Sequence, residues 1–401
     1  MKPLGKLCPF CIKEIPAEAE ACAYCGKQMP PRDRRADMRR YSDKYLELSS
    51  RMLRDCYFSA GGKNVMISPL SILLLLSMAA DGTKGSTRQE ILDALGDPEA
   101  GPALGWLREA IAEDPSFSSA SAVCVRKDKA PSVRREYGER LRQVYGGEIF
   151  ASEHMTEDVD AWVSKNTRGM IRDAAPDTLD QMVLCLLNAV AFEGSWEEPY
   201  PDYRIGTANF TNADGTVSRV KMLRGEENRY IENRDFTGFI KDYRDGDFSY
   251  AALLPRREGV EALESALMRL NLRSALMPEY GVEVQTGLPE HKFEFARDMT
   301  SLCMELGIER MFDDGADFSA MASFPLKVES VTHKTYLEVD RTGTRAAAFT
   351  GGWAAEAYEP EKRREKVYLN RPFVFAICWN ALPVFLGVVN SLEDTDNGEK
   401  K

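Results

Sequence analysis

The sequence predicts an α+β fold, in which helices and strands are mixed along the chain without strict alternation. Helical periodicity is clear in the N-terminal third, where Tyr45, Leu48 and Met52 lie on one face of a predicted helix. A continuous apolar run, residues 183–192, is typical of a strand that is buried on both faces. The chain has 401 residues, of which 44% are hydrophobic, and this is enough for one large packed core.

The charge and the apolar pattern argue against some classes of partner. The net charge of -11 argues against nucleic acid as a main partner, because attraction to phosphate dominates such binding. No apolar run reaches the roughly 18 residues of a transmembrane helix, so no membrane partner is expected. The first residues lack the apolar core of a signal peptide, which predicts a cytoplasmic protein. Export to the extracellular space by a non-standard route is the alternative.

Four cysteines near the N-terminus have the spacing of a metal site. These residues, which form two C-x-x-C pairs, are Cys8, Cys11, Cys22 and Cys25. Four converging thiolates suit tetrahedral zinc, and a structural zinc ion would supply the folding free energy that so short a segment lacks. Iron, two disulfides and a redox C-x-x-C are the alternatives. Residues 1–28 resemble a short bacterial zinc ribbon.

The segments that flank the main body are polar. Residues 29–41 contain Pro30, Pro31 and five arginines, and we predict a stiff basic linker there. Residues 42–393 form the main body. Residues 394–401 form an acidic tail that is predicted to be disordered.

Start and stop signals define the first elements of the body. Residues 64–67 predict a short strand, and Ser68 then suits the N-cap of an apolar helix that is expected to be buried all round. A capping-box pattern from Ser86 to Gln89 predicts the start of the next helix, and Gly96 predicts its end.

The chain is organised around a stretch near its C-terminus, residues 338–370. If the middle of this stretch is extended, its side chains alternate between two faces. The small residues of one face are Thr344, Ala346, Ala348 and Thr350. The other face carries Arg345 and Phe349. A strand with one face of small residues could enter between two existing strands without a clash, whereas a flexible Gly/Ala loop is the alternative.

Three segments carry a resemblance to a known family. HKTYLEVDRTGTRAAA, from His333, resembles the strand and hinge that precede the reactive loop of serpins. VYLNRPFVFAI, from Val367, resembles the strand after that loop, and PVFLGVVNSL, from Pro383, resembles the C-terminal strand. The chain is therefore identified as a member of the serpin family, of bacterial type, with an N-terminal addition. The resemblance implies a large mixed central sheet, further sheets, surrounding helices and an exposed reactive loop.

The resemblance implies an inhibitor of serine-type endopeptidases that traps its target in a covalent complex. The protease would cleave the reactive loop, and the loop would insert into the central sheet before the acyl-enzyme is hydrolysed. The small-residue face favours true inhibition. The hinge is assigned to Gly343, Thr344, Arg345, Ala346, Ala347, Ala348, Phe349 and Thr350.

The family pattern also places the scissile bond. With Gly343 as the fifteenth residue before cleavage, the bond lies between Ala357 and Tyr358. Alanine at this position implies an elastase-like target, because the specificity pocket reads that side chain. The loop is longer than usual, so Tyr358 with a chymotrypsin-like target remains open. Arg363 or Arg364 with a trypsin-like target remains open too, as does cross-reaction with cysteine proteases.

Residues that control opening of the sheet in the family have counterparts in this chain. By resemblance these are Ser68, Ser71, Asn188, Trp196 and His333. A buried asparagine needs a hydrogen-bond partner, and a pair of Asn188 with His333 across neighbouring strands is expected to hold the closed sheet.

No enzymatic activity is expected. The chain has only three histidines, and none lies in a catalytic motif. Two further functions are open. One is a serpin-fold binding protein that does not inhibit, and the other is a zinc-ribbon adaptor whose function lies in residues 1–40. The protein is expected to be a monomer that meets a serine protease.

Overall fold

The computed structural model describes most of the main body. The described residues are 34–176, 178–244, 247–329, 331–344 and 363–394, together with the paired short strands β1 (Gly5–Leu7) and β2 (Glu14–Pro16). The hinge beyond Thr344, both residues of the predicted scissile bond and the four N-terminal cysteines lie outside these ranges. Within them, no helix is long and apolar enough to cross a membrane.

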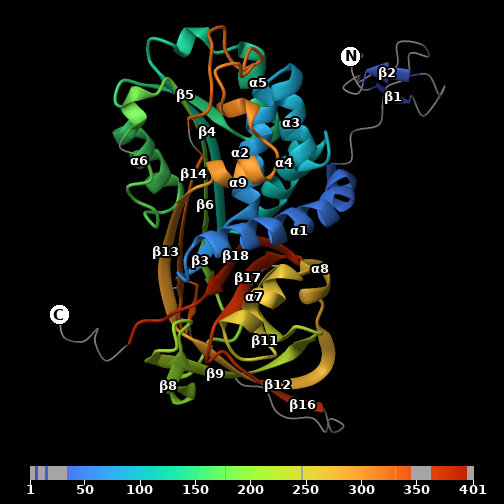
Figure 1. The fold of residues 1–401 in the computed structure, drawn as a ribbon, viewed down its shortest axis with the longest axis vertical. Coiled ribbons are helices and arrows are strands. Elements are labelled where there is room, and N and C mark those ends of the chain that lie inside the picture. The colour runs from blue at the N-terminus through green and yellow to red at the C-terminus, as the bar shows by residue number, and fades with distance from the viewer. Residues whose placement is uncertain are drawn as a thin grey trace.

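Most of the helices lie in one half of the molecule, above the largest sheet in the view of Figure 1. The helices are α1 (Arg34–Ser59), α2 (Pro69–Gly82), α3 (Gly85–Leu95), α4 (Ala100–Ile111), α5 (Arg135–Tyr145), α6 (Met155–Asn166), α7 (Val260–Met268), α8 (Leu272–Ala275) and α9 (Thr300–Glu305). The apolar helix α2 is almost entirely buried, and the Ser68 side chain caps it by accepting a hydrogen bond from the Ser71 amide, as predicted.

Two predicted boundaries are wrong. Helix α1 begins at Arg34, inside the segment predicted as a linker, because Met38 and Tyr41 are buried on its inner face and extend the apolar stripe. Helix α3 begins one residue before Ser86, so that serine lies in the first turn and no side chain caps the helix. The predicted end at Gly96 is confirmed by its left-handed backbone, with φ of 74°.

Strands and helices alternate irregularly, which confirms the α+β class. The strands of the body are β3 (Val65–Ile67), β4 (Phe117–Arg126), β5 (Glu148–Ser152), β6 (Leu184–Phe192), β7 (Gly194–Ser195), β8 (Ile205–Thr211), β9 (Val217–Glu232), β10 (Phe236–Asp242), β11 (Phe248–Pro255), β12 (Glu279–Pro289), β13 (His291–Asp298), β14 (Thr332–Val339), β15 (Gly343–Thr344), β16 (Arg363–Tyr368), β17 (Phe373–Trp379) and β18 (Leu382–Val389).

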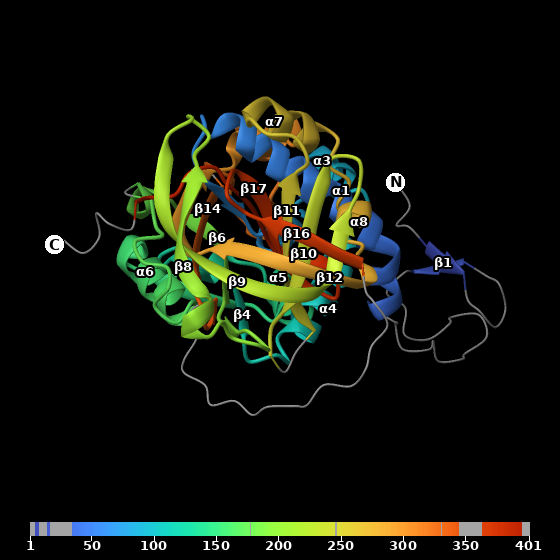
Figure 2. The ribbon, with the colours of Figure 1, turned by 90° about the horizontal axis from the view of Figure 1, so that it is seen from below.

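The largest sheet has nine strands. Its order is β16-β12-β9-β10-β11-β17-β18-β3, and β8 pairs with the long strand β9. Seen from below, β8, β9, β12 and β16 lie toward the viewer (Figure 2). The last strands of the chain, β17 and β18, lie inside this sheet and are almost completely buried, as their apolar sequences predict.

The strands that the sequence places in one central sheet form two separate ladders. One has the order β5-β4-β6 and the other has the order β13-β14-β15-β7. Strands β6 and β14 are the facing edges of the two ladders and do not pair with each other. Among the described residues, strand pairing connects the two parts at one end, where β7 follows directly on β6 and pairs with β15. The central sheet is therefore open along most of its length.

Candidate functional site

The start of the predicted hinge is a strand inside the open sheet. In β15, Gly343 pairs with Ser195 and Thr344 pairs with Gly194, while Val339 of β14 flanks Thr344 on the other side. Thr344 is 2% exposed, so its side chain points into the molecule as the alternation of small residues predicts. The remaining hinge residues, from Arg345 to Thr350, lie outside the described residues.

The Thr344 hydroxyl has a specific partner. Its oxygen lies 2.6 Å from the phenol oxygen of Tyr243, which is also buried. A larger side chain has little room here, because a Cβ at neighbouring Gly194 would lie within 3 Å of Phe192 and Tyr243. The site therefore accepts a small residue that can hydrogen-bond, and threonine meets both needs.

A tight turn leads from β14 into β15. The Asp340 carboxylate accepts hydrogen bonds from the amides of Thr342 and Gly343, at 2.7 and 3.1 Å. Arg341 forms an ion pair with Asp202, and its carbonyl accepts from the amide of Tyr200. Arg341 and Thr342 thus form contacts that stabilise the turn.

Trp196 packs beneath this turn. Its indole N–H donates to the Asp340 carbonyl at 2.9 Å, and its amide donates to the Thr342 carbonyl at the same distance. The indole stacks on the Tyr243 ring, with ring centres 4.4 Å apart and an interplanar angle of 16°. The structure therefore places Trp196 at the point where the hinge enters the sheet.

A buried ion pair under Trp196 was not found from the sequence. Lys241 and Glu227 lie 3.0 Å apart, and the Lys241 ammonium lies 4.6 Å from the Tyr200 ring and 5.6 Å from the Trp196 ring. Burial raises the pKa of Glu227, and the charge of Lys241 opposes this shift. The position of Lys241 directly after the apolar residues Phe239 and Ile240 of β10 was the available signal, because a buried lysine needs an anionic partner.

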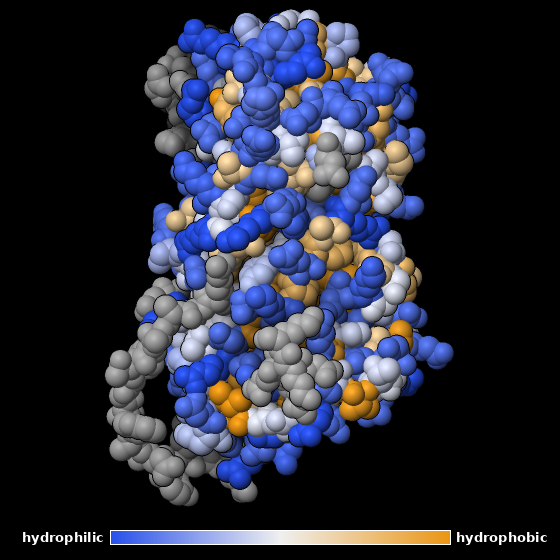
Figure 3. Space-filling model, turned by 90° about the vertical axis from the view of Figure 1, so that its left-hand side faces the viewer, coloured by the Kyte–Doolittle hydropathy of each residue, from blue (hydrophilic) through white to orange (hydrophobic). Residues whose placement is uncertain are grey.

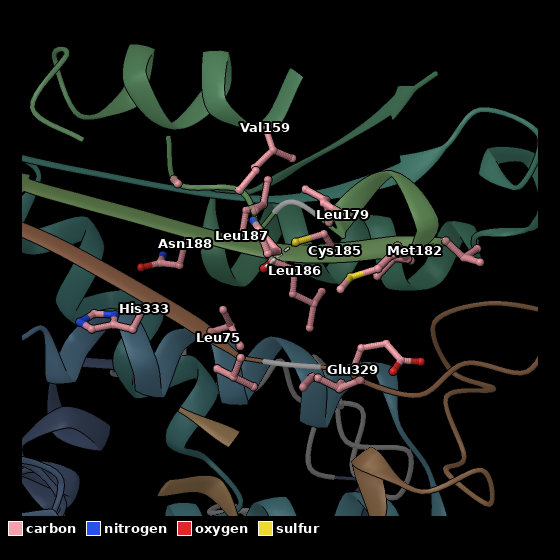
Figure 4. A pocket seen from close by; sticks show the side chains of 18 of the residues that line it. Leu75, Val159, Leu179, Met182, Cys185, Leu186, Leu187, Asn188, Glu329 and His333 are labelled. Carbon is pink, nitrogen blue, oxygen red and sulfur yellow. Dashed lines mark hydrogen bonds between the residues drawn. The ribbon is translucent and has the colours of Figure 1, made fainter. Parts of the chain in front are cut away.

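A cleft separates the first residues of β6 from the first residues of β14, at the end of the open sheet away from the hinge. It has a volume of about 750 Å³ and is lined mainly by apolar side chains. Figure 4 shows Val159 of α6 on one side of the cleft and Leu75 of α2 on the other, with Leu186 of β6 between them. On the face that carries α6 and β13, apolar atoms reach the surface among hydrophilic ones (Figure 3). The cleft has the position that an additional strand would occupy.

The predicted pair of Asn188 and His333 is not formed. The Asn188 amide donates to the Ala120 carbonyl at 3.3 Å and to the Ser121 hydroxyl at 3.0 Å, and its own oxygen is buried without a partner among the described residues. His333 Nε2 accepts from the Ser68 amide at 3.0 Å. The pairing prediction is wrong because β6 and β14 are separated by the cleft.

The start of α2 contacts both sides of the open sheet. The Ser68 amide donates to His333 of β14, and the Ser71 hydroxyl donates to the Asn188 carbonyl of β6 at 3.4 Å. Burial lowers the pKa of His333 to about 4, so its ring is neutral at pH 7. Because Nε2 accepts a hydrogen bond, the ring proton is on Nδ1. Ser68, Ser71, Asn188 and His333 thus form one group, and Trp196 lies apart at the hinge.

The strand after the loop contains both arginines that were alternative cleavage positions. Arg363 pairs with Val282 and Arg364 pairs with Glu283 in the ladder between β16 and β12. The Arg363 guanidinium also forms ion pairs with Glu232, Glu279 and Glu365, at 2.7, 3.2 and 2.8 Å. The predicted bond between Ala357 and Tyr358 lies outside the described residues.

The structure gives no geometry for the predicted zinc ligands. Cys8, Cys11, Cys22 and Cys25 are outside the described residues, and β1 ends immediately before the first of them. In the part of the chain that the structure does describe, no group of three or more His, Cys, Asp or Glu side chains could hold a metal ion. The zinc site therefore remains a prediction from sequence.

Comparisons with known proteins agree on the architecture. The family model for Serpin (serine protease inhibitor) matches residues 43–392. Iripin-4 of Ixodes ricinus is 30% identical over 354 residues, which cover 82% of this chain and 89% of the relative. Leukocyte elastase inhibitor of Equus caballus is 29% identical over 366 residues, covering 82% and 93%. The native state of the thermophilic serpin tengpin superimposes with a TM-score of 0.76 at 28% identity, covering 91% of this chain and 96% of tengpin.

Proposed function

The chain belongs to the serpin family, and we propose that it inhibits serine-type endopeptidases by acting as a suicide substrate. Proteins of this family are described as serine protease inhibitors. The observation that carries the proposal is β15, whose two residues already occupy strand positions between β14 and β7 at the hinge end of the open sheet, whereas the cleft lies farther along, beside the first residues of β6 and β14. Residues that follow Thr344 need only continue in the same direction to fill the space between β6 and β14.

The chemistry of the first step belongs to the protease. Its catalytic serine attacks the carbonyl carbon of the scissile bond, and the chain that follows the bond leaves with a new amino terminus. The N-terminal part of the loop stays attached to the protease through an ester. Because cleavage separates it from the chain that follows the bond, this part can continue the strand that β15 begins. It carries the attached protease with it across the molecule.

The insertion has a sufficient driving force. A net backbone hydrogen bond contributes about 0.5–1.5 kcal/mol, so a new strand with a ladder on both sides contributes on the order of 10 kcal/mol. Filling the apolar cleft adds a hydrophobic contribution. The side chains that line this 750 Å³ space lack packing partners on one side, and an inserted strand would supply them. These terms together are comparable to the whole stability of an ordinary domain.

We propose an elastase-like target, with Ala357 as the specificity residue and cleavage before Tyr358. The ladder and ion pairs of Arg363 argue against cleavage at the two arginines, because a protease binds its substrate as an exposed extended segment. The relative named leukocyte elastase inhibitor is consistent with this choice. Because each chain has one reactive bond, one monomer is proposed to trap one protease.

The N-terminal addition is proposed to bind zinc through Cys8, Cys11, Cys22 and Cys25. The support is their spacing, which resembles bacterial zinc ribbons. Purified protein should contain one zinc ion per chain by elemental analysis, and Cys8→Ser together with Cys22→Ser should remove it. Iron in place of zinc, or no metal in the unsubstituted protein, would contradict the proposal.

A reducing compartment, the cytoplasm, is proposed as the place of action. All five cysteines of the body, namely Cys56, Cys124, Cys185, Cys303 and Cys378, are free thiols. Proteins of oxidising compartments commonly use such residues in disulfides. Digesting the surface of intact cells with a protease and assaying the culture medium would test this assignment, since only extracellular protein would be degraded or recovered there.

The decisive experiment is incubation with elastase-, chymotrypsin- and trypsin-like proteases and with one cysteine protease. The expected result is a complex with the elastase-like enzyme that survives denaturing electrophoresis, together with a released peptide that begins at Tyr358. Ala357→Arg should transfer complex formation to the trypsin-like enzyme. Complete cleavage without a covalent complex for every protease would contradict inhibition.

Deleting residues 1–28 should leave inhibition unchanged. Loss of inhibition in this deletion variant would favour the adaptor function.

A further inference from the structure

Two free cysteines lie directly opposite each other beneath α6. Strands β4 and β6 pair antiparallel, and their register places Cys124 opposite Cys185. Directly opposite residues project from the same face of a sheet. Both side chains accordingly belong to one apolar cluster, which includes Val159 and Val163 of α6 and Leu187 of β6. The two thiols are therefore neighbours in a shared apolar environment.

The Cα spacing expected at this pair lies within the range of disulfides, whereas the Cβ spacing of a hydrogen-bonded pair is wider than in a relaxed disulfide, so the bond would be strained. The Arg126 amide donates to the Val183 carbonyl at 2.9 Å, which makes these two residues a hydrogen-bonded pair of the ladder. Bonded and non-bonded pairs alternate along antiparallel strands, so Cys124 and Cys185, two residues further on, also form a bonded pair. Such pairs have Cα atoms about 5.5 Å apart. Disulfides most often have Cα separations of about 5.5–6 Å.

The two thiols differ in access. Cys124 is fully buried, whereas Cys185 is partly exposed and lines the cleft between β6 and β14 (Figure 4). A small reagent that enters the cleft therefore reaches Cys185 first. Once Cys185 has reacted, Cys124 is the nearest thiol in the register and can attack it from the neighbouring strand.

We propose that Cys124 and Cys185 form a reversible redox site, which closes to a cross-strand disulfide when a low-molecular-weight disulfide is the oxidant. Disulfides between directly paired strands depart from relaxed geometry and are more easily reduced than structural ones, which suits a site that opens and closes. In the reduced chain the two thiols pack as small apolar side chains.

The reaction is balanced with glutathione disulfide as the oxidant. Cys185 loses its proton and attacks one sulfur of the oxidant, and one glutathione leaves as a thiol while a mixed disulfide forms. Cys124 then loses its proton and attacks Sγ of Cys185, and the second glutathione leaves. In total, the two protein thiols lose two electrons and two protons, and one glutathione disulfide becomes two glutathione thiols.

Closure of the site has a definite consequence for the sheet. Strand β6 forms one wall of the cleft, and the disulfide joins it covalently to β4 on its other side. Separation of strands is then confined to the gap between β6 and β14. Burial raises the pKa of both thiols to about 12, so the thiolate fraction is small and oxidation is slow. The site therefore responds to sustained oxidation rather than to brief exposure.

The test uses the full-length reduced protein and requires no protease, so its outcome is independent of the proposed inhibition. The protein is incubated with glutathione disulfide under native conditions, its remaining thiols are alkylated, and it is digested with trypsin without reduction. The expected product is a cross-link between the peptides 109–126 and 173–204, which mass spectrometry detects and which disappears after reduction. Cys303→Ser should leave the cross-link intact, because Cys303 lies on another element.

Two variants report the order of the steps. Cys124→Ser should accumulate a stable glutathione adduct on Cys185, because the resolving thiol is gone. Cys185→Ser should leave Cys124 unmodified in the folded protein. Absence of the cross-link in the folded unsubstituted protein, with both cysteines recovered alkylated or with a lasting adduct on Cys185, would overturn the proposal. A cross-link that forms only in urea would overturn it as well, since the native register would then play no part.

Discussion

The nine-stranded sheet and the open sheet are built in opposite ways. In the first, β17 and β18 each pair with a strand on both sides, and the backbones lie so close that a Cβ at Gly387 would meet the Val65 carbonyl at 2.4 Å. In the second, β6 and β14 each have a free edge along the cleft, and the Asn188 oxygen is buried without a partner in the described part of the chain.

Under the proposed mechanism, this difference determines where free energy would be released by insertion of a strand. A completed sheet gains nothing from another strand, whereas an open sheet gains a ladder on each side and a filled cleft. Among the described strands, β15 alone joins the two parts of the open sheet, because it pairs with β14 on one side and with β7 on the other. Substitutions in the two regions should therefore affect different properties, namely stability in the closed sheet and inhibition in the open one.

The largest expected effect is on the first inserted side chain. Thr344→Arg should abolish the covalent complex and convert the protein into a plain substrate, because an unpaired charge would have to occupy the buried site beside Tyr243. The measurement is the number of inhibitor molecules consumed per protease trapped, which should rise by more than about tenfold. Arg345→Glu is the control, since alternation points it away from the sheet, and it should inhibit normally. Unimpaired inhibition by Thr344→Arg would contradict the insertion mechanism.

The next effect contrasts apolar truncations in the two regions. Phe375→Ala in β17 should lower the free energy of unfolding by about 3–5 kcal/mol, because it leaves a cavity in the fully packed sheet. Leu186→Ala should cost only about 1 kcal/mol, since this side chain already faces the cleft. Urea unfolding would measure both. Equal losses at the two positions would mean that the cleft lining is packed as tightly as the core.

Acid should destabilise both regions through buried histidines. Burial lowers the pKa of His291 and of His333 to about 4, below the usual 6.5. The unfolded chain takes up these protons first, so stability is complete above about pH 6.5 and falls as the pH decreases toward 4. Each histidine contributes on the order of 3 kcal/mol to this loss.

Substitution separates the two contributions. His333→Gln should remove the acid sensitivity that arises beside the cleft and leave that of His291, which begins β13 of the open sheet but packs its ring against Phe373 and Phe375 of the closed sheet. The measurement is the free energy of unfolding at pH values between 4 and 7. An unchanged pH dependence in His333→Gln would assign all the sensitivity to other groups.

The smallest effect should come from removing the Tyr243 hydroxyl, which contacts Thr344 at the start of the hinge. Tyr243→Phe removes the partner of Thr344 and should weaken the attachment of β15 by about 1 kcal/mol. Faster proteolysis after the start of the hinge, at unchanged global stability, would reveal this release. Tyr250→Phe is the matched control, because the Tyr250 hydroxyl is buried with no partner among the described residues and its removal should cost little.

Much of the fold could be predicted from the sequence, because local signals specify it. The cap at Ser68, the buried helix α2 and the apolar strands β17 and β18 follow from capping, periodicity and continuous hydrophobicity. The inward position of Thr344 follows from alternation. Each of these features depends on neighbours within a few residues along the chain.

The features that sequence reasoning missed depend on partners far apart in the chain. The open gap between β6 and β14 has no local signal, because the apolar run of β6 would suit a paired strand equally well. The Lys241–Glu227 pair and the Tyr243–Thr344 contact join residues 14 and 101 positions apart. The opposition of Cys124 and Cys185 required the register of β4 and β6. Such juxtapositions are properties of the assembled sheets.

The place of the last strands affects the synthesis of the protein. β3, near the N-terminus, pairs only with β18, and the Tyr45 hydroxyl of α1 donates to the Pro383 carbonyl. Until β17 and β18 have left the ribosome, β11 and β3 present unpaired edges that can bind other nascent chains. Chaperones should therefore be needed until these two strands have emerged, and a premature stop before β17 should send the product to aggregation or degradation.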